Sequence, residues 1–142
     1  GRGYLLTKIP AQTSLVWDFT DCPDLAQTIC VIAAVKNISL TLTGLESLKV
    51  KETDRVVALQ NELKKLGATL TEKEANHLYE VKGDFAAVST IDPIETYDDH
   101  RMAMAFAPVA MQKEITLLDP MVVNKSYPSF WKHISLILKS NL

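Results

Sequence analysis

The sequence has few cysteines and histidines and no long apolar run, and each shortage excludes a class of protein. Its two cysteines, Cys22 and Cys30, lack metal-ligand spacing, and two thiols without a secretory signal indicate a reduced, cytoplasmic protein. The three histidines also lack ligand spacing, so we expect no metal and no other cofactor. The longest apolar stretch, residues 102–111, is too short to span a bilayer and contains Pro108.

An excess of charge of one sign is also missing. The formal net charge of -2 gives no field that would attract nucleic acid or an anionic membrane, so any basic site must be local. What is present is ordinary for a soluble globular protein: 142 residues, 47% hydrophobic and 23% charged, which is enough for one domain with a real core. The chain begins at Gly1 without a methionine, and we interpret it as a fragment.

The most informative stretch is Lys49–Arg55, which mixes three basic with two acidic residues and opens a helix predicted over residues 52–66. Unpaired backbone N–H groups carry partial positive charge at a helix start, so Lys51 and Arg55 there favour an anion site. Glu52 lies three residues before Arg55 on the same helix face, where a carboxylate could move a proton on a bound anion. The alternative is a capped helix with surface ion pairs.

The other elements alternate between strands and helices, which is typical of an α/β (or α+β) fold. Strands are predicted at residues 4–7, 15–19, 39–43, 68–72, 78–82 and 115–118. Further helices are predicted at residues 25–35, 101–112 and from about 128 to 138. The helix at 25–35 is apolar almost all round and is expected to be buried, and Pro108 should kink the helix at 101–112.

The order of these elements repeats. Asp24 and Asp99 each begin an apolar helix, which a two-residue break, a strand, a loop, a lysine and a second helix follow. The lysines, Lys51 and Lys125, keep nearly the same spacing as the aspartates. We therefore predict one strand–helix–strand–helix unit used twice, closed by a hairpin at least in its first copy, with equivalent helices starting at the same end. The alternative is chance similarity between two α/β stretches.

The repeat gathers the chemically active residues at one end of the fold. Predicted helix starts carry Asp24, Lys51, Glu52, Arg55, Asp99, His100, Arg101 and Lys125. Such a face would bind small anions and transfer protons. Each residue also has a structural alternative, because aspartates cap helices, arginines form local ion pairs and most lysines are solvated.

Several motifs resemble one enzyme family closely. They are residues 23–26 (PDLA), 48–55 (LKVKETDR), 97–104 (YDDHRMAM), 118–120 (LDP) and 125–130 (KSYPSF). Together they resemble 5-enolpyruvylshikimate-3-phosphate (EPSP) synthases over nearly the whole chain from Trp17 onward. The resemblance implies a two-lobed enzyme with three βαβαββ units in each lobe. This chain would be the C-terminal part of one lobe, with one unit at about 15–90, a partial unit at about 91–142 and the tail of a preceding unit at 1–14.

The resemblance also implies roles for particular residues. Arg55, Arg101 and Lys125 match residues that hold phosphoenolpyruvate, and His100 matches a residue that lines the same pocket. Lys51 matches a shikimate contact, and Ser47 stands where some members have an asparagine that makes a further one.

The carboxylates would carry the proton transfers. Asp24 matches a contact to the shikimate hydroxyls and a candidate base for the 5-hydroxyl, and Glu52 matches the residue proposed to move a proton at the enolpyruvyl carbon. With Lys125, they form the predicted catalytic set.

The implied reaction transfers the enolpyruvyl group from phosphoenolpyruvate to the 5-hydroxyl of shikimate-3-phosphate, by addition and then elimination of phosphate. The reaction belongs to the shikimate pathway to chorismate and the aromatic amino acids. The implied partners are these two substrates and the missing N-terminal part of the enzyme, without which the chain is expected to be inactive. The alternatives are an enzyme like the UDP-N-acetylglucosamine enolpyruvyl transferases and a non-catalytic anion-binding module.

Overall fold

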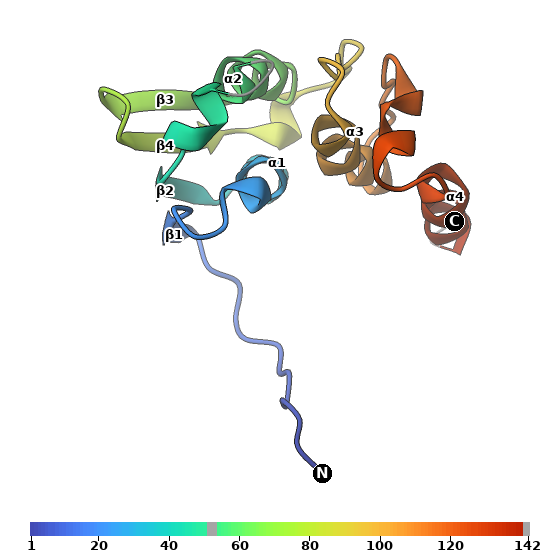
Figure 1. Cartoon of the computed structure of the whole chain (residues 1–142), viewed down its shortest axis with the longest axis horizontal. Helices are drawn as coiled ribbons and strands as arrows, with labels where there is room; N and C mark the ends of the chain where they lie inside the picture. The colour runs from blue at the N-terminus through green and yellow to red at the C-terminus, as the bar shows by residue number, and fades with distance from the viewer. Residues whose placement is uncertain (51–53, 141–142) are drawn as a thin grey trace.

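A single four-stranded sheet organises the first two thirds of the chain (Figure 1). The computed structural model describes residues 1–50 and 54–140. The sheet has the strand order β1 (Ser14–Asp18), β2 (Ser39–Thr43), β4 (Leu78–Gly83), β3 (Ala68–Glu74). β1 pairs with β2 in parallel, and the other neighbours are antiparallel. The mixed sheet confirms the predicted fold class, and the division into repeat units remains a prediction.

The two helices of this part connect the strands and cover the sheet. Parallel strands need a crossover connection, and α1 (Ala26–Val35) provides it between β1 and β2. α2 (Arg55–Lys65) leads into the β3–β4 hairpin, so the element order is βαβαββ. α1 packs on β2 and β4, and α2 packs on β3. Side chains in β2 alternate between buried and partly exposed, as expected for a sheet with one covered face.

The second part of the chain contains α3 (His100–Phe106) and α4 (Phe130–Ser140). α3 packs beside α1, so the two parts share one hydrophobic core that includes Met102 and Phe106 of α3 (Figure 1). A short 3-10 helix at Pro120–Lys125 packs on the other side of α3. The beginning of α3 is thus held between segments far apart in the sequence. In the described residues, no helix combines the length and the hydrophobicity needed to cross a bilayer.

Local sequence signals explain where the helices begin and end. Asp54 caps α2, because its carboxylate accepts hydrogen bonds from the backbone N–H groups of Val56 and Val57. Gly67 follows α2 with φ +72°, a left-handed conformation that ends the helix as predicted. Residues 52 and 53, where the sequence predicted the helix to start, lie outside the described residues.

Three expectations need correction. The strand at residues 4–7 is wrong: this segment extends away from the fold, and no strand of the described residues pairs with it (Figure 1). The strand at residues 115–118 is reduced to one parallel bridge between Ile94 and Leu117. α1 is not buried all round, since Ile32 on its outer face is exposed. Pro108 acts as predicted, because α3 changes at Ala107 into a 3-10 helix.

Gly44 provides the first test of this fold, because its φ of +81° is left-handed and its neighbours are close. An added Cβ would lie 2.7 Å from the Asp18 carboxylate and 2.7 Å from the Phe19 carbonyl carbon. We expect Gly44→Ala to lower the free energy of unfolding by about 2–4 kcal/mol, measured by urea denaturation. Gly3→Ala is the control, since nothing lies within 4 Å of that position. Equal stability of the two variants would contradict the assigned turn.

Candidate functional site

The beginnings of α1, α2 and α3 meet at one end of the fold, as the repeat predicted. Asp24 lies in the 3-10 helix Pro23–Leu25 that leads into α1. Arg55 is the first residue of α2, and Asp99 caps α3. Ion pairs link these three residues and Arg101 across long stretches of sequence. Four residues of the predicted polar face therefore form a connected cluster, which we call the helix-start cluster: Asp24, Arg55, Asp99 and Arg101.

Asp99 is the buried centre of this cluster, with 6% of its side chain exposed. One carboxylate oxygen accepts from the Arg55 Nε–H at 2.9 Å and from the Gln27 Nε2–H at 3.2 Å. The other accepts from the backbone N–H of Arg101 at 2.8 Å. Asp99 is thus a helix cap and also the group that fixes the Arg55 guanidinium.

Asp24 is in a different environment, because 54% of its side chain is exposed. Its carboxylate lies 3.0 Å from Arg101 Nη2 and 4.0 Å from Arg55 Nη1. In the described residues it makes no helix-capping hydrogen bond at this end of α1. Arg101 therefore pairs with Asp24 and not with the adjacent aspartates. The two guanidinium groups share one solvent-accessible carboxylate, in the place where an anionic ligand could bind them.

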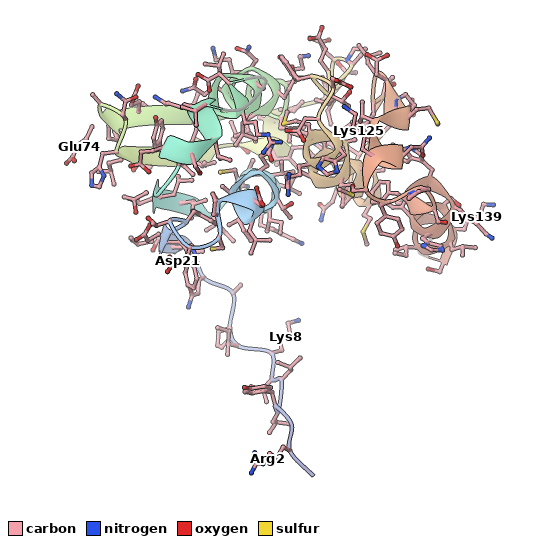
Figure 2. The ribbon with its side chains drawn as sticks, viewed as in Figure 1. Arg2, Lys8, Asp21, Glu74, Lys125 and Lys139 are labelled. Atoms are coloured by element: carbon pink, nitrogen blue, oxygen red, sulfur yellow. The ribbon has the colours of Figure 1, made fainter. Side chains whose placement is uncertain are left out.

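A second group of polar residues continues the cluster toward the C-terminal part. His100 contacts the Ser126 hydroxyl through Nδ1, and its Nε2 lies 3.3 Å from Arg101 Nη1. Lys125 Nζ lies 2.8 Å from the Asp98 carboxylate and donates to the Asp98 backbone carbonyl at 3.0 Å. Figure 2 shows Lys125 beside α3, on the segment that precedes α4. The lysine is therefore held at the site.

Each cation of the site has a carboxylate partner: Arg55 with Asp99, Arg101 with Asp24, and Lys125 with Asp98. The described site is therefore close to neutral, although the sequence alone suggested an open cationic clamp. An incoming anion would have to exchange with a carboxylate. Asp24 is easier to displace than Asp99, because an exposed ion pair contributes little while separating a buried one is costly.

Some predicted site residues are not part of this cluster. Lys51 and Glu52 lie outside the described residues. Ser47 is exposed in the 3-10 helix Glu46–Val50, and no hydrogen bond among the described residues joins it to the helix-start cluster. No group of three or more His, Cys, Asp and Glu side chains in the described ranges could hold a metal ion.

Sequence reasoning missed two polar neighbours of the site. Gln27 is fully buried and orients Asp99, and its Oε1 is the one buried side-chain polar atom among the described residues that lacks a hydrogen-bond partner. A glutamine inside an apolar helix was the available signal, because a buried amide needs partners. Ser126 gave no signal of its own beyond its place next to Lys125.

Comparison with known proteins identifies a family for this arrangement. The family model described as EPSP synthase (3-phosphoshikimate 1-carboxyvinyltransferase) matches residues 7–134. A 3-phosphoshikimate 1-carboxyvinyltransferase of Bacteroides fragilis is 50% identical over 115 residues, which are 80% of this chain and 28% of the relative. One of Clostridium novyi is 35% identical over 134 residues, which are 93% of this chain and 30% of the relative.

A solved structure supports the same family. The structure of EPSP synthase from Acinetobacter baumannii matches with a TM-score of 0.63 at 30% identity, over 78% of this chain and 26% of that one. The chain thus spans less than a third of the length of the relatives that it matches.

The role of Asp99 as the centre of the cluster can be tested by removing its charge. Asp99→Asn would leave the mostly buried Arg55 guanidinium without its closest carboxylate, so we expect unfolding free energy to fall by about 2–3 kcal/mol. Asp98→Asn is the control, because the exposed Asp98–Lys125 pair should contribute less than about 1 kcal/mol. Chemical denaturation measures both, and similar losses would argue against a buried central pair.

Proposed function

Because the chain belongs to the EPSP synthase family, we propose that it forms one wall of the active site of an enolpyruvyl transferase. The enzyme would transfer the enolpyruvyl group of phosphoenolpyruvate to the 5-hydroxyl of shikimate-3-phosphate and release phosphate. The observation that carries this proposal is the convergence of Arg55 and Arg101 on the exposed Asp24 carboxylate. Two planar guanidinium groups around one exchangeable carboxylate suit a ligand that has both a carboxylate and a phosphate.

Binding of phosphoenolpyruvate would then be an exchange of anions. The ligand would take the place of Asp24 beside Arg101, while the buried Asp99 keeps Arg55 in position. Lys125 and His100 border the same space and could contact the ligand phosphate or carboxylate.

The exchange would also prepare Asp24 for chemistry. Once Arg101 binds the ligand, the Asp24 carboxylate can accept the proton of the 5-hydroxyl as that oxygen attacks C2 of phosphoenolpyruvate. An acid protonates C3, and a tetrahedral intermediate forms. A base then removes a proton from the new methyl group as phosphate leaves. We assign both steps at C3 to Glu52 on the resemblance alone.

The second substrate needs groups beyond this chain. The chain spans less than a third of its relatives' length, so we propose that the remaining part of the enzyme supplies most contacts to shikimate-3-phosphate. This chain and the remaining part of the enzyme would together exclude water from the intermediate.

Arg101→Lys in the complete enzyme tests the proposal directly. A lysine keeps the charge but loses the planar fork, so we expect the KM for phosphoenolpyruvate to rise about tenfold while the KM for shikimate-3-phosphate changes little. Phosphate release measures both constants. Lys73→Arg is the control, because this exchange of the two cations falls in the β3–β4 hairpin, where Lys73 pairs with Glu80. The extended N-terminal segment that carries Arg2 (Figure 2) is unsuitable, since the resemblance assigns it to a preceding unit of the complete enzyme.

Three results would overturn the assignment. An unchanged KM for phosphoenolpyruvate in Arg101→Lys would remove Arg101 from the binding site. Phosphate release with UDP-N-acetylglucosamine but not with shikimate-3-phosphate would favour the related sugar-nucleotide enzymes. Binding of phosphoenolpyruvate without turnover of either acceptor would favour an anion-binding module.

A further inference from the structure

A second buried carboxylate lies next to the site and takes no part in the proposed chemistry. Glu62 of α2 is 1% exposed, and burying a charged carboxylate is costly unless donors surround it. Three donors do so. Lys65 Nζ lies at 2.7 Å, the Tyr97 hydroxyl at 2.8 Å and the backbone N–H of Glu95 at 3.1 Å. Two of these donors come from the segment that precedes α3, so the carboxylate ties α2 to that segment.

The partners of Glu62 all fix the segment that leads into α3. Tyr97 and Glu95 belong to this segment, and Lys65 also donates to the Pro93 carbonyl at 2.8 Å. Arg55 and Glu62 are seven residues apart, so they lie on the same face of α2. One face of α2 therefore holds residues 93–99 at two places, at Asp99 through Arg55 and at Tyr97 through Glu62.

The backbone held between these two places has an unfavourable conformation. Tyr97 and Asp98 are consecutive non-glycine residues with φ of +54° and +53°. Left-handed conformations are uncommon for such residues and persist only where the surroundings impose them. In this turn the Asp98 carbonyl and carboxylate both contact the Lys125 ammonium group. The turn also places Asp99 at the start of α3, where it caps the helix. The positions of Lys125 and Arg55 therefore both depend on this turn, because their carboxylate partners Asp98 and Asp99 lie in it or directly after it.

We propose that Glu62 is a positioning residue for the anion site. It holds the left-handed Tyr97–Asp98 turn in place, and this turn keeps Asp98 paired with Lys125 and Asp99 paired with Arg55. The proposal rests on the proposed function for its effect on phosphoenolpyruvate. The contact itself does not depend on that function. Glu62 touches none of the residues proposed to bind substrate, so its effect passes through Tyr97 and Glu95.

The chemistry of the Tyr97–Glu62 contact suits a permanent anchor. Burial, followed by the hydrogen bond to the Glu62 carboxylate, raises the pKa of the Tyr97 phenol above its ordinary value. The phenol therefore stays protonated and keeps donating through the neutral range. A charge-assisted hydrogen bond of this kind is stronger than a neutral one. The anchor should thus hold the turn whether or not an anion is bound.

Tyr97→Phe tests the proposal in the complete enzyme, because it removes one oxygen atom and leaves the ring to pack. Tyr79→Phe is a matched control, since Tyr79 donates to the Glu72 carboxylate at 3.2 Å within the β3–β4 hairpin. We expect Tyr97→Phe to raise the KM for phosphoenolpyruvate about fivefold with little change in kcat, because loosened binding groups affect the ground state and the transition state alike. Glu62→Gln should act in the same direction. Tyr79→Phe should leave the KM unchanged.

Amide hydrogen exchange gives a readout that needs no ligand. The Asp99 N–H donates to the Thr96 carbonyl, and the Arg101 N–H donates to Asp99, so both report on the turn. We expect both amides to exchange about fivefold faster in Tyr97→Phe and at the wild-type rate in Tyr79→Phe. Equal exchange rates of these amides in the two variants would show that the Tyr97–Glu62 contact does not hold the turn. Faster exchange with an unchanged KM would overturn its effect on anion binding.

The two readouts separate this proposal from the proposed function. If the wild-type enzyme does not turn over phosphoenolpyruvate, the proposed function fails, and amide exchange still decides whether Glu62 orders the turn. If the enzyme is active and both readouts of Tyr97→Phe match the Tyr79→Phe control, the enzymatic assignment stands and the positioning role is wrong.

Discussion

The need to pair one buried negative charge organises both the packing and the site of this protein. The Asp99 carboxylate is almost inaccessible to water, so protein donors must replace its hydration. Those donors come from three elements: Gln27 of α1, Arg55 of α2 and the first turn of α3. Each helix can satisfy Asp99 only if its N-terminal end lies within hydrogen-bond distance of it. The same contacts that fix the relative position of the helices therefore place two guanidinium groups side by side.

The difference between Asp99 and Asp24 decides how such a site can remain stable and still bind an anion. Both aspartates pair with arginines, but one is buried and the other is about half exposed. A buried pair that loses one member leaves an uncompensated charge, whereas an exposed pair exchanges its partner at small cost. On the proposed function, an anion of suitable shape would displace Asp24 from Arg101 and leave Asp99 paired with Arg55. The cluster separates a structural ion pair from an exchangeable one within a few ångströms.

The sequence predicted local features better than long-range ones, for a physical reason. Hydrophobic periodicity and capping residues act over a few positions, so β2, the hairpin, the end of α2 at Gly67 and the cap at Asp99 were all predictable. The strand at residues 4–7 failed because a strand needs a partner that the local pattern does not provide. The pairing of Arg101 with Asp24 was not predicted, because the two residues lie far apart in the sequence. Glu62 gave no signal, since a single glutamate in an amphipathic helix resembles a solvated one until the tertiary contacts are known.

The contacts of α2 show why the anchor lies away from the reacting groups. A loop fixed only by its own binding residues would lose its geometry whenever a ligand exchanged with them. Here Arg55 and Glu62 hold residues 93–99 at two places seven helix positions apart, and only the first is near the exchangeable carboxylate. The second contact is made by the buried Glu62 carboxylate, which lies outside the helix-start cluster. On these proposals, the left-handed turn between them would keep its conformation while Asp24 is displaced, so the site would stay organised for an anion before and after binding.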